Sequence, residues 1–293
     1  MWKRKDGRGY GVGTIESSYT NKWGDNKVTI YYPAGRSDRN APQDIAGPPY
    51  PALVFAHGFA ASKDFYRWVG NQLASWGYVA ALFNVPGPIS TGLNQWSDGI
   101  SDCIGYLHEL SASNTSILRN MVDSNRIGAM GHSMGGAAAI LAAASDPRIK
   151  AMVALAPGNS KLGSFVFRKA LDAARMVKAP VQIQVGSGDR ITPKDLVYQY
   201  YANIPGVAPK EYVEIKGGSH IQFTDSLSIL LPMFDLAGTL GLDRQHQISG
   251  LFFTAWFQCF LRGEHRFETY IFGAGAEDAK TTGALSALEW VRP

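Results

Sequence analysis

The stretch RIGAMGHSMGGAAAILAAAS, residues 126–145, decides the fold. Its first part is rich in small and apolar residues, as expected of a strand buried on both faces, and its alanine-rich end is typical of a helix. Between them lies the pattern G-x-S-x-G, from Gly131 to Gly135. In this context the pattern predicts a sharp turn that gives Ser133 a positive φ and lifts its hydroxyl clear of the sheet. Side chains at 131 and 135 would collide with neighbouring backbone, so we expect glycine to be required there.

Outward from this stretch the chain alternates between short apolar runs and helix-like segments. The other runs predicted as buried strands are 52–56, 78–83, 150–157, 179–186 and 211–218, and the helix-like segments are 62–76, 95–110, 163–177, 193–203 and 245–262. Strands of this kind that alternate with helices indicate a mostly parallel sheet. Residues 10–19 and 27–32 have no helix between them and indicate an antiparallel edge pair. We therefore expect an α/β fold with a mostly parallel central sheet of about eight strands and helices on both faces.

The composition is that of a folded globular chain. Of its 293 residues, 45% are hydrophobic, and 28 lysines and arginines against 24 aspartates and glutamates leave a net charge of +4. This excludes an intrinsically disordered chain, and the charge is too small and too scattered to predict a nucleic-acid partner. After a loop-like zone at 33–51 we find no second composition break. We therefore expect one domain over 1–293, acting as a monomer.

Cysteine content and apolar runs bear on the compartment. Cys103 and Cys259 lie far apart in helix-like segments, so we expect two buried small side chains and no disulfide framework. The longest unbroken apolar run, 137–144, is far shorter than the ~18 residues of a membrane span. No apolar stretch follows the basic start, so no signal peptide is visible. The chain is then either cytoplasmic or a secreted mature form from which the signal has been removed.

A serine nucleophile needs a base and an acid that orients the base. Of the six histidines, two belong to turn motifs and three lie in helix-like segments; His220 alone follows a late strand, in GGSH. The acid should fall between serine and histidine, and Asp189 does so in GSGDRITP, directly after the strand 179–186. Asp195 is the nearest competitor but falls inside the next helix. The alternative for Asp189 is a turn or capping aspartate.

Two backbone N–H groups should stabilise the oxyanion of the tetrahedral intermediate. We expect one from Met134, directly after the nucleophile, and one from Phe59 in the HGFA turn after the strand 52–56. Phe59, Met134 and Ile221 should also border an apolar substrate cleft. We find no P-loop, no H-E-x-x-H and no clustered cysteine and histidine spacing, so neither a cofactor nor a metal ion is expected.

These residues resemble the α/β-hydrolase superfamily over almost the whole chain. The likeness is to bacterial cutinases and polyester (PET) hydrolases and to dienelactone-hydrolase-like esterases. It is carried in order by VTIYYPAG (28–35), PALVFAHGFAASKDFY (51–66), LASWGYVAALFNVPGP (73–88), RIGAMGHSMGG (126–136), IKAMVALAP (149–157), PVQIQVGSGDRITP (180–193) and VEIKGGSH (213–220). The resemblance implies a cofactor-free serine hydrolase of carboxylic esters, in which the residues matching Phe59 and Met134 supply the oxyanion donors.

The chain departs from that resemblance in ways that leave alternatives open. Polyester hydrolases usually carry a tryptophan after the Ala-Pro of the strand that follows the turn, but here Gly158-Asn159 stands there; the C-terminal cysteine pair of many cutinases is also absent. A general short-chain carboxylesterase, a chlorophyllase-like or dienelactone-hydrolase-like enzyme, and a non-catalytic binding protein on a hydrolase scaffold are the alternatives. The segment 222–242, with the apolar run 229–234, is a candidate lid or pocket wall.

Overall fold

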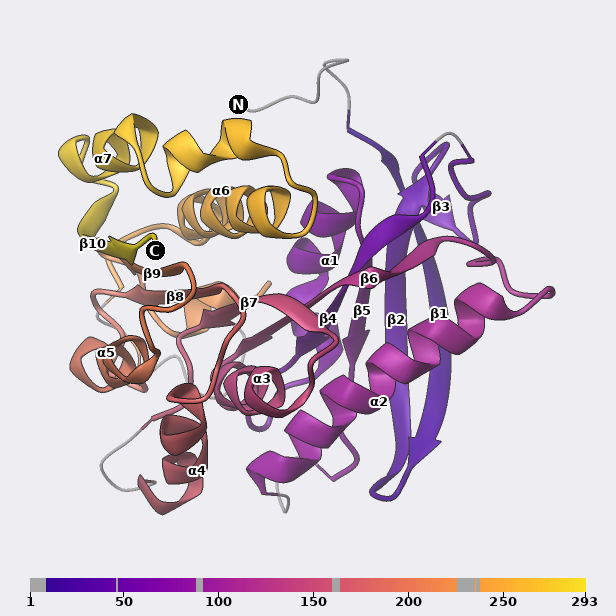
Figure 1. Ribbon diagram of the computed structural model, residues 1–293, viewed down its shortest axis with the longest axis horizontal. Coiled ribbons are helices and arrows are strands. Elements are labelled where there is room, and N and C mark those ends of the chain that lie inside the picture. Colours follow the sequence, from indigo (N-terminus) through magenta and orange to yellow (C-terminus); the bar gives the residue numbers. More distant parts are fainter. Residues whose placement is uncertain (1–8, 46, 88–91, 160–163, 226–234, 236–237) are drawn as a thin grey trace.

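The computed structural model describes residues 9–45, 47–87, 92–159, 164–225, 235 and 238–293. Its strands are β1 (Gly11–Asn21), β2 (Gly24–Ala34), β3 (Asp38–Arg39), β4 (Tyr50–Ala56), β5 (Val79–Phe83), β6 (Val122–His132), β7 (Ile149–Leu155), β8 (Val181–Gly186), β9 (Lys210–Ile215) and β10 (Leu285–Val291). They form one sheet in the order β10-β9-β8-β7-β6-β4-β5-β2-β1-β3 (Figure 1).

The middle of this sheet is parallel, as the alternation of apolar runs and helices predicts. β5, β4, β6, β7, β8 and β9 pair in parallel. β1 and β2 form the expected antiparallel pair, and β2 joins β5 antiparallel. The sheet has ten strands rather than about eight, because two-residue β3 pairs with β1 and C-terminal β10 pairs with β9. Neither of the two carries the short apolar run by which the buried strands were predicted.

Helices cover both faces of the sheet. They are α1 (Arg67–Ser75), α2 (Leu93–Ala112), α3 (Met134–Ser145), α4 (Ser164–Ala174), α5 (Lys194–Asn203), α6 (Leu242–Phe260) and α7 (Ala274–Thr281), with short 3₁₀ segments at Lys63–Tyr66, Ile221–Phe223 and His265–Tyr270. In Figure 1, α1, α6 and α7 lie on one side and α2, α3, α4 and α5 on the other. No helix in the described part of the chain is long and apolar enough to span a membrane.

Each face of the sheet has its own apolar core. One core packs α2, α3 and α5 on the sheet through side chains such as Trp96, Ile140 and Tyr200. The other packs α1 and α6 on the opposite face through side chains such as Leu73 and Trp256. Cys103 and Cys259 are both buried and free, one in each core, which confirms the expectation of two small buried side chains.

A ladder of polar side chains runs through the second core, between the sheet and α6. Gln182 Nε2 donates to Glu211 Oε2 (2.6 Å), and Gln184 Nε2 donates to Gln182 Oε1 (2.8 Å). Ser249 Oγ of α6 donates in turn to Gln184 Oε1 (2.6 Å). Glu211 is fully buried, and its Oε1 has no partner among the described residues. Burial raises the pKa of Glu211 well above its usual value, so the folded chain holds this carboxyl in its neutral form.

Replacing Glu211 by glutamine should therefore change how stability depends on pH. Above pH 4.5 the unfolded carboxyl loses its proton while the folded one keeps it, so wild-type stability falls as pH rises toward the folded pKa, by up to about 1.4 kcal/mol per pH unit. Glutamine does not titrate, so the Glu211→Gln variant should gain on the wild type from pH 5 to pH 8. Urea unfolding at each pH measures the difference.

The matched control is Glu109→Gln, which removes an exposed carboxyl on α2. Its stability difference from the wild type should stay nearly constant with pH. A Glu211→Gln difference that is equally constant would show that the buried group is not held neutral.

Candidate active site

The turn between β6 and α3 is built around two glycines. A Cβ at Gly131 would lie 2.3 Å from the carbonyl oxygen of Gly135, and a Cβ at Gly135 would lie 2.1 Å from the carbonyl oxygen of Ala56. Both distances are far below any contact that real Cβ atoms make, so only glycine fits. Ser133 between them has φ 55° and ψ −121° and directly precedes α3. Its hydroxyl therefore stands at the C-terminal edge of the parallel strands, beside a helix N-terminus.

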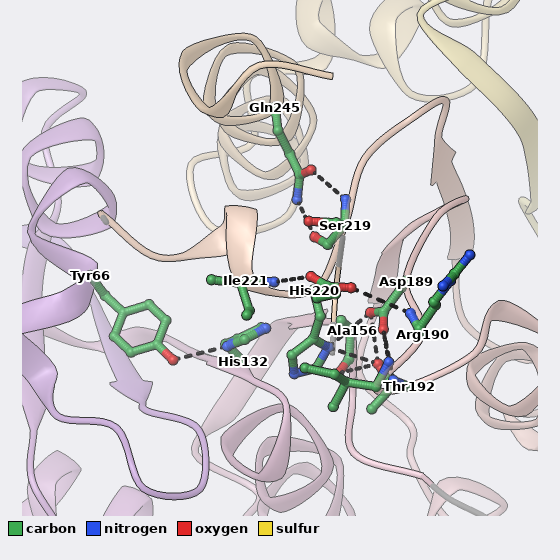
Figure 2. Close-up of polar contacts among 12 residues, drawn as sticks. Tyr66, His132, Ala156, Asp189, Arg190, Thr192, Ser219, His220, Ile221 and Gln245 are labelled. Carbon is green, nitrogen blue, oxygen red and sulfur yellow. Dashed lines mark hydrogen bonds and ion pairs between the residues drawn. The ribbon is translucent and has the colours of Figure 1, made fainter. Parts of the chain in front are cut away.

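Asp189 and His220 meet at the same edge of the sheet. Asp189 follows β8 and His220 follows β9, and Oδ2 of Asp189 lies 2.8 Å from Nδ1 of His220 (Figure 2). Oδ1 of the aspartate accepts the backbone N–H of Ile191 (2.9 Å) and of Thr192 (2.7 Å). The Thr192 hydroxyl lies 2.8 Å from Asp189 Oδ2 and 3.0 Å from His220 Nδ1. The aspartate thus serves as a turn residue and as the partner of the imidazole at once.

The carboxylates near His220 raise its pKa by more than burial lowers it. Burial lowers the pKa of His220, whereas the charge and hydrogen bond of Asp189 raise it, as does the charge of Asp235, and the net shift is upward. The loop is held from behind by α6, where the Gln245 side chain pairs with both the N–H and the C=O of Ser219, each at 2.9 Å. His220 is therefore fixed by contacts on both sides (Figure 2).

A second histidine, His132, which the sequence pattern indicated only as part of the turn motif, lies beside the ring of His220. The ring centroid of His132 is 4.4 Å from that of His220. Burial, followed by the charge of His220, lowers the pKa of His132 well below its usual value, so it stays neutral. Its Nδ1 lies 2.9 Å from the Tyr66 hydroxyl, which also accepts the N–H of Gly58 (3.2 Å). Tyr66 thereby links the turn that holds Ser133 to the HGFA turn.

Ser133 directly follows His132, whose ring lies beside that of His220. Its N–H donates to Leu155 O (2.9 Å), and its C=O accepts the N–H of Gly158 (2.7 Å), which fixes the backbone on both sides. Among the described residues, no direct hydrogen bond joins the Ser133 hydroxyl to His220. In unliganded enzymes catalytic hydrogen bonds are often long and tighten only when substrate is bound.

The two expected oxyanion donors are the backbone N–H groups of Phe59 and Met134. Within the described residues, neither the N–H of Phe59 nor that of Met134 donates to a protein acceptor. The Phe59 side chain is 48% exposed, whereas Met134 and Ile221 are largely buried. His57 is no candidate base, because burial lowers its pKa to about 4 and its Nε2 accepts the N–H of Val85 (3.2 Å).

The position expected to carry a tryptophan in polyester hydrolases is filled differently here. Asn159 is buried and donates through Nδ2 to the carbonyl of Leu196 (2.8 Å), so it is tied to α5. A Cβ at Gly158 would lie 2.5 Å from the ring of Phe167 of α4. The ring of Phe167 therefore occupies the space beside this glycine.

The candidate lid is only partly described by the structure. Of the candidate lid at 222–242, residues 226–234 and 236–237 lie outside the described residues. Just before them, the carboxylate of Asp225 accepts the N–H groups of Arg67 (2.5 Å) and Trp68 (3.1 Å) and ties the segment to α1. Within the described ranges, no three histidine, cysteine, aspartate or glutamate side chains are grouped as metal ligands would be.

Comparison with known proteins agrees with this architecture. A family model described as PET hydrolase-like matches residues 7–287. The chain is 30% identical to a bis(hydroxyethyl) terephthalate hydrolase of Streptomyces coelicolor, over 66% of this chain and 54% of the relative. It is 24% identical to cutinase est2 of Thermobifida alba, over 90% and 72%, and 26% identical to a cutinase of Thermobifida fusca, over 66% and 56%. The matches thus span little more than half of two of these relatives. With nearly its whole length matched by the family model, the chain belongs to the PET hydrolase-like family of α/β-hydrolases.

Proposed function

We propose that the chain hydrolyses carboxylic esters through an acyl-enzyme, with Ser133 as nucleophile, His220 as general base and Asp189 as the acid that orients it. The observation that carries the proposal is the buried Asp189–His220 pair, 2.8 Å apart, beside a strained serine turn. A hydroxyl alone is a weak nucleophile at neutral pH, and an adjacent oriented base is what activates it.

The three side chains and the two N–H groups have distinct roles in the reaction. His220 takes the proton of Ser133 as the hydroxyl attacks the ester carbonyl, and the negative charge that develops on the carbonyl oxygen is met by the N–H groups of Phe59 and Met134. Asp189 holds Nδ1 of the imidazole and stabilises the imidazolium. His220 then returns the proton to the leaving alcohol, and water activated by the same base releases the acid.

The substrate class follows from the family and from the side chains at the site. The relatives are named as a hydrolase of bis(hydroxyethyl) terephthalate and as cutinases, and the exposed Phe59 ring offers an apolar contact. Cutinase-like activity on neutral apolar esters, polyester included, is therefore the leading proposal. Gly158-Asn159 favours a second candidate, a short-chain carboxylesterase, because a buried asparagine tied to α5 stands where a tryptophan ring would stack on an aromatic polymer.

Substrate range separates these two candidates. We expect release of terephthalate from bis(hydroxyethyl) terephthalate and of p-nitrophenol from short-chain p-nitrophenyl esters in either case. Soluble products from PET film or polycaprolactone, followed by chromatography, should appear only for the polyester hydrolase. Activity on anilides and not on esters would contradict both.

Replacing Ser133 by alanine should lower kcat for p-nitrophenyl butyrate by about 10⁴-fold or more, because the nucleophile is lost while binding remains. A fluorophosphonate probe should label the wild type and not the Ser133→Ala variant. The melting temperature should be nearly unchanged, since only one hydroxyl is removed. Normal turnover by a folded Ser133→Ala variant would exclude Ser133 as the nucleophile.

Replacing Tyr66 by phenylalanine should reduce kcat by roughly 10-fold with little change in KM. The variant leaves the N–H of Gly58 and Nδ1 of His132 without their shared partner, so the turn that carries the Phe59 donor loses its anchor; loss of one oxyanion donor outright costs 10²–10³. Steady-state kinetics on the same ester measures both constants. Tyr32→Phe is the control, because it removes a buried hydroxyl bound to Ala41 O (2.7 Å) elsewhere in the fold. Equal losses of kcat in the two variants would contradict the role of Tyr66.

A further inference from the structure

A second buried carboxylate lies behind the Asp189–His220 pair. Asp235 Oδ2 accepts the backbone N–H of Ile221 (2.7 Å), directly after the base. Its Oδ1 accepts the N–H of Arg190 (3.4 Å), directly after the acid. The Ser219 side chain also hydrogen-bonds to it. Figure 2 shows Ser219, Ile221 and Arg190 arranged around the Asp189–His220 pair.

We propose that Asp235 is a positioning residue for the reaction: its carboxylate fastens the loop that carries His220 to the loop that carries Asp189 and sets a second negative charge beside the imidazole. This inference rests on the proposed function. Asp235 touches neither the nucleophile nor the oxyanion donors, and it acts through the placement and charge of His220.

The hydrogen bonds explain why the two loops depend on this residue. Elsewhere the loops are joined by the N–H of Gly188 to Gly218 O (2.9 Å) and by the N–H of Gly217 to the Ser187 hydroxyl (2.8 Å). Those bonds lie before the acid and before the base. The two backbone contacts of Asp235, to the N–H groups of Ile221 and Arg190, lie after both residues, so the Asp189–His220 pair is held between two sets of bonds. Without the carboxylate, the buried N–H of Ile221 would have no acceptor, which is costly.

The charged groups around His220 also point to Asp235. Asp189 hydrogen-bonds to the imidazole and Thr192 adds an uncharged hydroxyl. His132 faces the ring from β6 and is held neutral by burial. From α6 comes only the neutral amide of Gln245, which contacts the backbone of Ser219. The Arg190 side chain is exposed. Within the described residues, Asp235 is thus the one carboxylate besides Asp189 whose charge acts on His220.

The test compares Asp235→Asn with the wild type on a p-nitrophenyl ester across the pH range. Asparagine keeps the shape and one acceptor oxygen but removes the charge. We expect kcat to fall by about 10-fold with KM changed by less than about twofold, because bound substrate is not contacted. The acidic limb of kcat/KM, which reports protonation of the free base, should move to lower pH by about half a unit or more, since the imidazolium loses a favourable charge.

Asp225→Asn is the matched control. Asp225 belongs to the same part of the chain and also accepts two backbone N–H groups, those of Arg67 and Trp68, but its charge is not among those that act on His220. Its substitution should lower the melting temperature by an amount similar to Asp235→Asn and leave the acidic limb where it is. Should Asp235→Asn fail to fold, Asp235→Ser, which leaves room for water, should show the same downward shift of the limb.

The outcomes separate this inference from the proposed function. An Asp235→Asn variant with wild-type kcat and an unmoved acidic limb overturns the inference. A lower melting temperature with an unmoved limb, as in the control, also overturns it and leaves a purely structural anchor. In either case fluorophosphonate labelling of wild-type Ser133 would still stand for the proposed function. Absence of labelling in the wild type would contradict the proposed function itself.

Discussion

The fold of this chain depends on a steric constraint: β4, β6 and the start of α3 approach one another so closely that two positions of the connecting turn have no room for a side chain. Gly135 lies against the last carbonyl of β4, and Gly131 lies against Gly135 itself. Because the backbone is closed in on both sides, Ser133 is left with a positive φ directly before α3. The strain at one residue is maintained by the packing of three elements.

The remaining polar groups gather at the same edge because the strands are parallel. β6, β8 and β9 run parallel and end at that edge, so Asp189 and His220 meet beside His132, the last residue of β6, without any long loop having to reach across the molecule. Thr192 hydrogen-bonds to the Asp189–His220 pair on one side, and Gln245 holds the backbone of Ser219 on the other. The arrangement of the sheet thus brings the groups together, and side-chain hydrogen bonds set their orientation.

Sequence patterns predicted those parts of the fold and site that are governed by local sterics and strand order. The α/β fold of a hydrolase and the buried free cysteines are confirmed, and Asp189 lies beside His220 as chain order suggested. The hydrogen bond between Ser133 and His220 stays a prediction. The roles of Tyr66 and Asp235 were missed because sequence position does not reveal them. Tyr66 ends the matching stretch 51–66 and Asp235 lies in the candidate lid, but the partners of both are backbone or ring groups brought near only by tertiary packing. The short β3 and the more exposed β10 lack the buried apolar run that indicated the other strands.

The polar ladder under α6 has a consequence for how that helix is seated. An apolar helix can slide along an apolar face at small cost, but a slide of one turn here would leave Ser249, Gln184 and their neighbours without partners, at about 1–3 kcal/mol for each stranded group. The hydrogen bonds of the ladder therefore favour a single register of α6 on the sheet. Gln245, one turn before Ser249 on the same helix, hydrogen-bonds to the N–H and the C=O of Ser219, the residue before His220. Buried polar contacts of α6 with the sheet thus help to set the position of the loop that carries His220.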